Sequence, residues 1–400
     1  MKSEWTYRPL GELVSFASGG TPSKKRDDYW GGTIPWISAK TLKTENIDTS
    51  DLFITEEGLK AGSKIAPKGS ILLLTRGSGL FNGIPIARVE KDVAFNQDIK
   101  CLDSYGEVEN EFIFYWLLSQ KDYLMAKVGV TGIGAGKFDL DFLQKLMIPI
   151  PSERERKSIV GFANSISEKI RCNAKVNDNL EQQAVALFKS WFVDFSLFGG
   201  TVPENWEDTT LENITTLITR GIAPKYSDNS DQTVVNQKCI RNHTIDLSLA
   251  RTHTPKAINE KWLQFGDLLI NSTGDGTLGR VAQVWFAPKA LTVDSHVTIV
   301  RPAREELIFY IGLWGILHEK EIESLHTGST GQTELPRDRV KKLKLLLPDN
   351  ISLSRFNSII TPMASTIISN QEENQKLANL RDTLLPKLMS GVIDVANVQL

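Results

Sequence analysis

The chain has 400 residues, a hydrophobic content of 41% and a formal net charge of −2. This composition excludes a disordered chain. It also gives no global basic signature of a nucleic-acid-binding protein, although a local basic patch would be compatible with it. Three widely spaced cysteines form neither a CxxC pair nor a plausible zinc set. The cysteine pattern fits a protein of the reducing cytoplasm. The length predicts two or three domains.

The sequence shows no membrane or export segment. No apolar run approaches the ~20 residues that cross a bilayer. The first residues, MKSEWTYRPL, lack the apolar core of a signal peptide. We expect no membrane partner.

Residues 19–38 read GGTPSKKRDDYWGGTIPWIS and combine turn residues, charges and aromatic side chains. Glycines permit positive φ, and the charges suit a solvated loop. Rigid scaffolds also display recognition residues on such loops. The residues alone leave both interpretations open.

The chain contains an internal repeat whose offset stays near half its length. The first part of each copy is rich in short β-like runs separated by glycine turns. We predict two similar units of about 200 residues each. The matched pairs are LGELVSF 10–16 with LENITTL 211–217, KGSILLLTRGSG 68–79 with FGDLLINSTGDG 265–276, IARV 86–89 with VAQV 281–284, FIFYWLL 112–118 with LIFYIGL 307–313, and Thr131-Gly132 with Thr330-Gly331.

A long helix is predicted at the end of each copy. Ser152 and Glu155 form a capping box, and residues 152–191 contain no proline and one glycine. Apolar residues recur in heptads, which predicts a coiled coil. The rows are Ile159, Ile166, Asn173, Leu180, Leu187 and Ala163, Ile170, Asn177, Ala184, Trp191 in the first helix, and Phe356, Met363, Asn370, Leu377, Leu384 and Ile360, Ile367, Asn374, Arg381, Leu388 in the second.

Two features of these helices carry predictions. Asparagines at the same heptad of both helices predict a register-setting pair, namely Asn173 and Asn177 with Asn370 and Asn374. Alternatively, the asparagines are solvated because the seam is loose there. Pro362 predicts that the second helix is shorter than the first, or bent.

The helices are expected to pair antiparallel. Each β-rich domain precedes its own helix, so a parallel pair would place both domains at one end. About 35 helical residues span roughly 50 Å, which would separate the domains.

Three motifs resemble catalytic or cofactor sites, but each lacks a feature that such a site requires. Gly274-x-Gly276-x-x-Gly279 is followed by RVAQVWF, a strand pattern rather than the helix that a dinucleotide site needs. TGIGAGK, which ends at Lys137, lacks the first glycine and the hydroxyl residue of a P-loop. His296 has no metal-ligand spacing around it, and we interpret it as a strand-edge residue or a contact to a partner.

DNA binding is the interpretation that remains, because Arg and Lys neutralise phosphate, whereas Asn, Gln and Arg read base edges. The cations near residue 25 are expected to contact phosphates rather than bases. The candidate DNA-binding residues are Lys24, Lys25, Arg26, Lys40, Arg76, Asn96, Gln97, Lys137, Arg220, Lys225, Tyr226, Lys238, Arg241, Arg280, His296 and Gln332.

These segments together resemble the DNA-specificity subunits of type I restriction–modification enzymes, over the whole length of the chain. The segments that carry the resemblance are LGELVSFASGGTPS with YWGGTIPWISAKTL, residues 148–153 (IPIPSE), LFKSWFVDF 187–195, PENWE 203–207 and LLPKLMSGVID 384–394. The second copy departs from the opening motif, which implies that the two halves read different bases.

The resemblance implies an α+β fold with two β-rich target-recognition domains, residues 1–150 and 199–348. Two spacer helices, residues 151–198 and 349–400, would form an antiparallel coiled coil with a pseudo-two-fold repeat. It further implies a non-catalytic chain without a cofactor of its own, which binds double-stranded DNA. Its partners would be two methyltransferase subunits, which bind S-adenosylmethionine, and restriction subunits, which use ATP and Mg. A coiled-coil scaffold that binds proteins and not DNA is the alternative.

Overall fold

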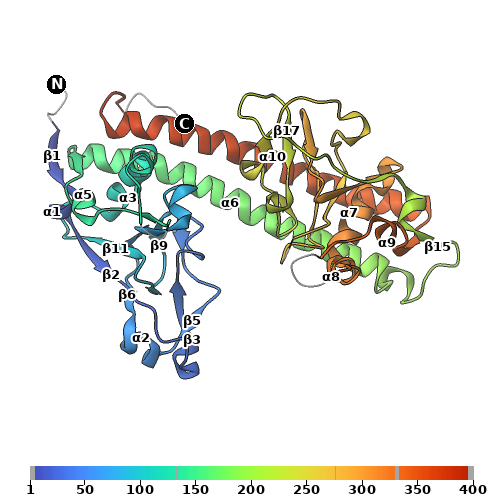
Figure 1. The fold of residues 1–400 in the computed structure, drawn as a ribbon, viewed down its shortest axis with the longest axis horizontal. Coiled ribbons are helices and arrows are strands. Elements are labelled where there is room, and N and C mark those ends of the chain that lie inside the picture. The colour runs from blue at the N-terminus through green and yellow to red at the C-terminus, as the bar shows by residue number, and fades with distance from the viewer. Residues whose placement is uncertain (1–4, 132–133, 275, 329–332, 395–400) are drawn as a thin grey trace. The chain divides into compact units, whose positions relative to one another are not determined.

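The computed structural model describes residues 5–131, 134–274, 276–328 and 333–394 (Figure 1). The chain folds into two compact units. Unit 1 contains the residues up to Arg171 and those from Asn374 onward, and unit 2 contains Cys172–Glu373. Each unit therefore holds one β-rich domain and a part of both long helices.

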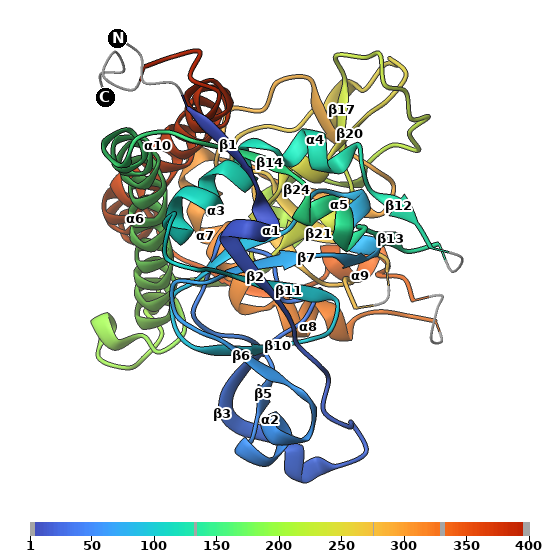
Figure 2. The same cartoon turned by 90° about the vertical axis from the view of Figure 1, so that its left-hand side faces the viewer.

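The main sheet of unit 1 has five strands in the order β2-β11-β7-β9-β4. All four residues of β7 are buried, as expected for a strand with both faces covered. Helix α3 (Asn110–Ser119) packs on β9, and Figure 2 shows this helix beside the strands of the sheet. The strands are β2 Val14–Ser18, β11 Ile99–Ser104, β7 Ile71–Leu74, β9 Ile86–Val89 and β4 Asn46–Ile47.

A second sheet of unit 1 has the order β5-β3-β10-β6, with β3 and β10 parallel. A two-stranded sheet, β1-β14, and a corner sheet, β12-β13-β8, complete the strands described in this unit. These elements are β5 Phe53–Ile54, β3 Trp30–Ile37, β10 Val93–Phe95, β6 Lys64–Ala66, β1 Thr6–Pro9, β14 Met147–Ile150, β12 Gly129–Val130, β13 Gly136–Lys137 and β8 Arg76–Gly77. The short helices are α1 Leu10–Leu13, α2 Glu56–Gly62, α4 Lys121–Met125 and α5 Leu140–Gln144.

Unit 2 repeats this arrangement. Its main sheet has the order β16-β24-β21-β22, and its second sheet, β20-β17-β23, contains a parallel β17–β23 pair. The strands are β16 Thr215–Arg220, β24 Val297–Pro302, β21 Leu268–Asn271, β22 Val281–Gln283, β20 Arg251–Thr252, β17 Thr233–Val235, β23 Leu291–Val293, β15 Glu207–Thr210, β25 Lys344–Leu347, β18 Ile240–Arg241 and β19 Thr244–Ile245. The helices are α7 Ile308–Leu317, α8 Glu319–Ser324 and α9 Arg337–Lys341.

Strand register extends the repeat into a region where the two sequences show no likeness. Ile37 lies opposite Phe95 in unit 1, and Val235 lies opposite Val293 in unit 2. IPWIS in the first copy therefore corresponds to QTVVN in the second. The strand predicted after Gly279 is also present, as β22.

Close backbone packing explains one glycine of the opening stretch. A Cβ atom built on Gly19 would lie 2.0 Å from the carbonyl oxygen of Phe95, and one on Gly221 would lie 1.9 Å from that of Val293. Both glycines follow equivalent strands, and neither position has room for a side chain. Gly19 is therefore a structural residue.

The two long helices are α6 (Glu153–Phe192) and α10 (Asn350–Met389), with 40 residues each. The capping box is present, because Glu155 accepts a hydrogen bond from the Ser152 backbone N–H at 3.0 Å. The second helix was predicted to be shorter than the first, or bent, and the first alternative is wrong because the two helices are equally long. Pro362 lies at an exposed position inside the helix, where the missing N–H costs one backbone hydrogen bond without ending the helix.

The helices pack antiparallel within each unit. In unit 1, the start of α6 shares a core with the end of α10 through Ile159, Ile166 and Leu388. In unit 2, the end of α6 shares a core with the start of α10 through Phe188 and Phe356. The described helices include none that is both long and apolar enough to cross a membrane.

Candidate nucleic-acid interface

A polar groove of about 730 Å³ lies at the corner sheet of unit 1. Arg76 of β8 and Lys137 of β13 are register partners on its wall. Lys100 and Lys127 also line it, while Asp139 is the one carboxylate among its lining residues. The excess of positive charge makes this groove the strongest candidate for phosphate binding in unit 1.

Two predicted residues near this groove differ in exposure. Gln97 lines the groove, is exposed, and accepts a 2.8 Å hydrogen bond from the Thr21 hydroxyl. Asn96 is buried, and its side chain accepts a 3.2 Å bond from the Asp98 N–H and donates to the Asp98 carboxylate at 3.1 Å. We infer that Asn96 shapes the turn, whereas Gln97 is free to contact a ligand.

The cations of the opening loop are not equivalent. Arg26 donates to both oxygens of Asp28, at 2.8 and 2.6 Å, and lies 4.8 Å from the centre of the Tyr29 ring. The Asp28 carboxylate holds the pKa of Arg26 above its ordinary value. Lys24 and Lys25 are exposed, and their side chains make no hydrogen bond or ion pair with the described residues. They remain candidates for phosphate contact.

Trp36 belongs to the fold rather than to the surface. Its ring is 3% exposed, and its N–H donates to the Gly20 carbonyl at 3.0 Å. Lys40 follows in the next turn and is exposed.

The equivalent corner of unit 2 carries different chemistry. Thr273 pairs with Glu334 where Arg76 pairs with Lys137 in unit 1. Arg220 neutralises Glu334 through a 2.6 Å ion pair and also donates to the Leu335 carbonyl at 2.9 Å. Arg220 is therefore committed to the fold of this corner.

Two other predicted residues lie near the same corner. His296 is exposed, and its Nδ1 lies 2.7 Å from the Thr273 hydroxyl. Arg280 is half-buried and donates to the Gly276 carbonyl at 2.7 Å. Gln332 lies outside the described residues.

The other predicted residues of unit 2 are exposed on the second sheet and its hairpin. Arg251 stacks 3.7 Å from the ring centre of Tyr226, beside the exposed Lys225. Lys238 follows β17, and Arg241 lies in β18 next to the β18–β19 turn.

Sequence reasoning did not select Lys100, Lys127 or Gln237. The side chain of Lys100 is hydrogen-bonded to Ser18 across β11 and β2, and Lys127 follows α4. Strand alternation for Lys100, and the position after a helix for Lys127, give only a weak indication that these lysines line a DNA-binding groove. Gln237 lies in the segment of unit 2 that has no visible likeness to unit 1, so the repeat could not indicate it.

Among the predicted register residues, Asn370 donates to Asn177 at 2.8 Å. Asn177 in turn points its amide at the Ile367 carbonyl, at 3.4 Å. Asn173 donates to Glu373 at 2.7 Å, and Asn374 is half-buried. All of these contacts lie within unit 2 or at its edge.

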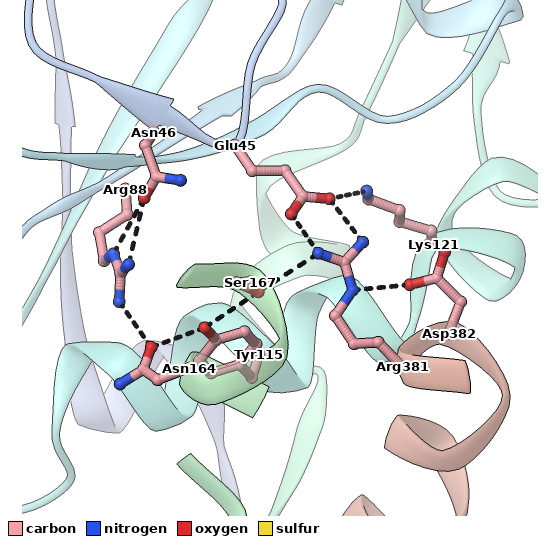
Figure 3. A network of polar contacts seen from close by, with 9 residues as sticks. All are labelled: Glu45, Asn46, Arg88, Tyr115, Lys121, Asn164, Ser167, Arg381 and Asp382. Atoms are coloured by element: carbon pink, nitrogen blue, oxygen red, sulfur yellow. Dashed lines mark hydrogen bonds and ion pairs between the residues drawn. The ribbon is translucent and has the colours of Figure 1, made fainter. Parts of the chain in front are cut away.

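A polar network fastens the domain of unit 1 to both helices (Figure 3). Glu45 accepts hydrogen bonds from Arg381 of α10 at 2.6 and 3.1 Å, and from Lys121 at 3.2 Å. On the α6 side, Asn164 accepts from the Tyr115 hydroxyl at 2.6 Å. Burial opposes ionisation of Glu45, but the charges of Arg381 and Lys121 hold its pKa below the ordinary value.

The domain of unit 1 is linked further to α6 by Arg88, which donates to Asn46 at 3.1 Å and to Asn164 at 3.0 Å. In the heptad rows, Ala184 stands on α6 where Arg381 stands on α10. The arginine anchor is therefore specific to unit 1.

Comparison with known proteins agrees with the sequence resemblance. Residues 2–182 match the family model described as the type I restriction modification DNA specificity domain. The chain is 27% identical, over 424 aligned positions, to the type I restriction enzyme MjaIX specificity subunit of Methanocaldococcus jannaschii, covering 98% of this chain and 94% of that protein. It is 31% identical over 161 residues, 40% of each chain, to the EcoR124I/EcoR124II specificity subunit of Escherichia coli.

A solved structure shows the same fold. The type I restriction–modification S subunit from M. genitalium superimposes with a TM-score of 0.54 over 96% of both chains, at 17% identity. Together with the internal repeat, the two β-rich units and the paired helices, these matches show that the chain resembles the specificity subunits of type I restriction–modification systems over nearly its whole length.

Proposed function

We propose that this chain selects the DNA sequence on which a type I restriction–modification complex acts. Each β-rich unit reads one half of a bipartite duplex site, and the two helices set the spacing between the halves. The main support is the contrast between the two units. The strands that the two units share follow the same order, but the equivalent surface corner carries Arg76 and Lys137 in one unit and Thr273 and Glu334 in the other. Two units with similar backbones but different surface side chains would recognise two different half-sites.

The chain works as a non-catalytic subunit in this proposal. Two methyltransferase subunits dock on the helical frame and supply S-adenosylmethionine, and restriction subunits supply ATP- and Mg-dependent cleavage. A net charge of −2 gives little general attraction to phosphate. The chain alone is therefore expected to bind DNA weakly and with strong salt dependence, and binding should tighten when the methyltransferase subunits are present.

Methylome sequencing of the host with and without the gene tests this function. We expect a bipartite adenine-methylation motif that disappears when the gene is deleted and returns when it is restored. Purified chain should transfer no methyl group without its partners. An unchanged methylome in the deletion strain would contradict the proposal and favour the scaffold function.

A further inference from the structure

Three polar side chains of unit 2 form a chain of hydrogen bonds at the surface corner. Thr273 donates its hydroxyl proton to the amide oxygen of Gln237 at 3.2 Å. His296 Nδ1 lies 2.7 Å from the same hydroxyl oxygen. A threonine hydroxyl has one proton, so His296 Nδ1 must be the donor in this second bond. The Thr273 hydroxyl thus accepts a hydrogen bond from His296 and donates one to the amide oxygen of Gln237, which holds the Gln237 side chain in place.

The backbone of Gln237 is also held in place. Asn271 is fully buried and donates its amide to the Gln237 carbonyl at 3.0 Å. Gly274 has a positive φ of 104°, and a Cβ atom built on it would lie 2.8 Å from the Gln237 amide nitrogen. The amide therefore packs against bare backbone, where another residue would displace it.

The Gln237 amide nitrogen is held in position by these contacts. It makes no hydrogen bond within the described residues, and the residue is only half-buried. A positioned carboxamide with an open N–H donor and an oxygen that can accept a second bond matches one base edge in the major groove, the N7 and N6 of adenine.

The same positions in unit 1 carry none of these groups. Ala39 lies two residues after Ile37, the end of β3, as Gln237 lies two residues after Val235, the end of β17, so Ala39 is the equivalent of Gln237. In the same way, Arg76 is the equivalent of Thr273. The Cβ of Ala39 lies 3.9 Å from a Cβ built on Gly77, the equivalent of Gly274. Asp98 replaces His296, since the carbonyls of these two residues accept the equivalent backbone bonds from Thr75 and Ser272. The backbone frame is shared, and only its side chains differ.

We propose that Gln237 is a base-reading residue of unit 2 that recognises adenine, with Thr273 and His296 as its positioning residues. This inference rests on the proposed function, because it assigns a reading role within one of the two half-sites. It predicts that unit 1 reads no base through the equivalent side chain, because the side chain of Ala39 has no polar atom.

The test compares methylomes directed by complexes that contain Gln237→Ala, Gln237→Glu and the wild-type chain. Both variants should lose about tenfold or more of the discrimination at one A·T pair in one half-site. Glutamate cannot donate to N7 and accepts from cytosine N4, so Gln237→Glu should shift the preference toward cytosine there. Gln264→Ala, the same substitution at an exposed glutamine of unit 2 that is not among the candidate DNA-binding residues, is the matched control and should leave both half-sites unchanged.

The outcomes separate this inference from the proposed function. If the wild-type chain directs no motif, the proposed function fails. If it directs a motif that both Gln237 variants leave unchanged, or if the relaxed position is not an A·T pair, the assignment of Gln237 is wrong. Equal melting temperatures of the variant and wild-type chains show that the fold is retained. Thr273→Val should relax the same position as Gln237→Ala, because the amide loses its support.

Discussion

At the scale of single residues, the neighbours of each cation in unit 1 decide what it can contribute to DNA binding. Arg26 is paired with Asp28, whereas Lys24 and Lys25 have no partner among the described residues. Lys127 and Lys137 line a groove that contains one carboxylate, Asp139. Charge that is already neutralised releases fewer counterions from DNA than open charge does.

The first prediction follows from this difference. In the assembled methyltransferase complex, Lys127→Ala or Lys137→Ala should weaken binding to all DNA sequences and lower the salt slope by about 0.9 per lost contact. Arg26→Ala should change the slope less, because Asp28 already balances its charge. Titrations of labelled duplex at several salt concentrations measure both effects. A change in the methylated sequence caused by Lys137→Ala would show that this lysine reads a base.

The second prediction concerns Arg381, which is 7% exposed and holds Glu45 (Figure 3). Arg381→Met should lower the free energy of unfolding by about 1–3 kcal/mol, because a largely buried carboxylate loses its main partner. The range is below that for fully buried pairs, since Glu45 is 28% exposed and screened by solvent. Adding Glu45→Gln should recover part of the loss, and Lys157→Ala, in an exposed ion pair, is the control.

This cost should depend on pH. The folded-state pKa of Glu45 lies below its ordinary value of 4.5, so its contribution is full above that value and is lost as pH falls through the folded pKa. The difference between wild type and Arg381→Met should therefore shrink below about pH 4.5. Urea unfolding at a series of pH values measures it, and a difference that stays constant on acidification would contradict the ionic origin of the effect.

The sequence predicted some residue roles better than others. Local chemistry was sufficient for the capping box, because Ser152 and Glu155 are three residues apart. The role of Arg381 could not be predicted, because its partner Glu45 is 336 positions away. Gln237 was missed for a similar reason, since its support comes from Thr273, which follows β21, and from His296, which lies in the turn between β23 and β24.

At the scale of elements, the start of α10 is held by a single carboxylate. Asp349 accepts hydrogen bonds from the Ser352 N–H at 3.0 Å and from the Trp206 ring N–H at 2.8 Å. Burial opposes ionisation of Asp349, but the hydrogen bonds that it accepts together lower its pKa from 3.8 to about 2. The cap therefore ties the entry of α10 to the beginning of the domain of unit 2.

The third prediction is that Asp349→Ala costs about 0.5–2 kcal/mol of stability, as the loss of a helix cap does. Because the pKa of Asp349 is lower in the folded state than in the unfolded state, its ionised carboxylate stabilises the fold above the unfolded pKa. This contribution should be lost between about pH 4 and pH 2. Asp349→Asn keeps an acceptor without the charge and should lose this pH dependence. Asp338→Asn, an exposed residue of α9, is the control. Equal acid sensitivity of wild type and Asp349→Asn in that window would rule out Asp349 as the source.

The fourth prediction concerns the asparagine pair between the helices in unit 2. Asn370→Leu should destabilise by about 1–3 kcal/mol, because it leaves the buried Asn177 oxygen without its donor. Replacing both asparagines with leucine should be closer to neutral or stabilising, since no polar group is then stranded. A double-mutant cycle on thermal unfolding gives the coupling free energy. A coupling near zero would mean that the pair does not fix the helix register.

At the scale of the whole molecule, repetition was the strongest signal in the sequence. It predicted two β-rich units and two long helices, and the shared strand orders confirm that part. The order of domain and helix along the chain predicted antiparallel pairing, and the helix segments pair in this way within each unit. The heptads run across Pro362, whereas the proline itself predicted a shorter or bent helix. The helix α10 continues through this residue because packing against the core of unit 2 outweighs one lost backbone hydrogen bond.

The fifth prediction treats α6 and α10 as the spacer that sets the gap between half-sites. Both helices are continuous through the boundaries of the two units, at Arg171/Cys172 and Glu373/Asn374. Duplicating residues 171–177 (RCNAKVN) after Asn177 and residues 368–374 (ISNQEEN) after Asn374 adds one heptad to each helix and repeats the asparagines. The apolar rows then keep their faces, so each domain retains its own contacts with the helices.

Seven added residues lengthen a helix by ~10 Å, which corresponds to about three base pairs of duplex. Methylome sequencing of this variant should therefore show an unread gap that is about three base pairs longer, while the bases of both half-sites stay the same. The insertion in α6 alone is the control. It shifts one helix against the other, strands apolar residues in solvent and should abolish methylation through misfolding. An unchanged gap in the double insertion, or altered bases with the original gap, would mean that contacts other than the helices set the spacing.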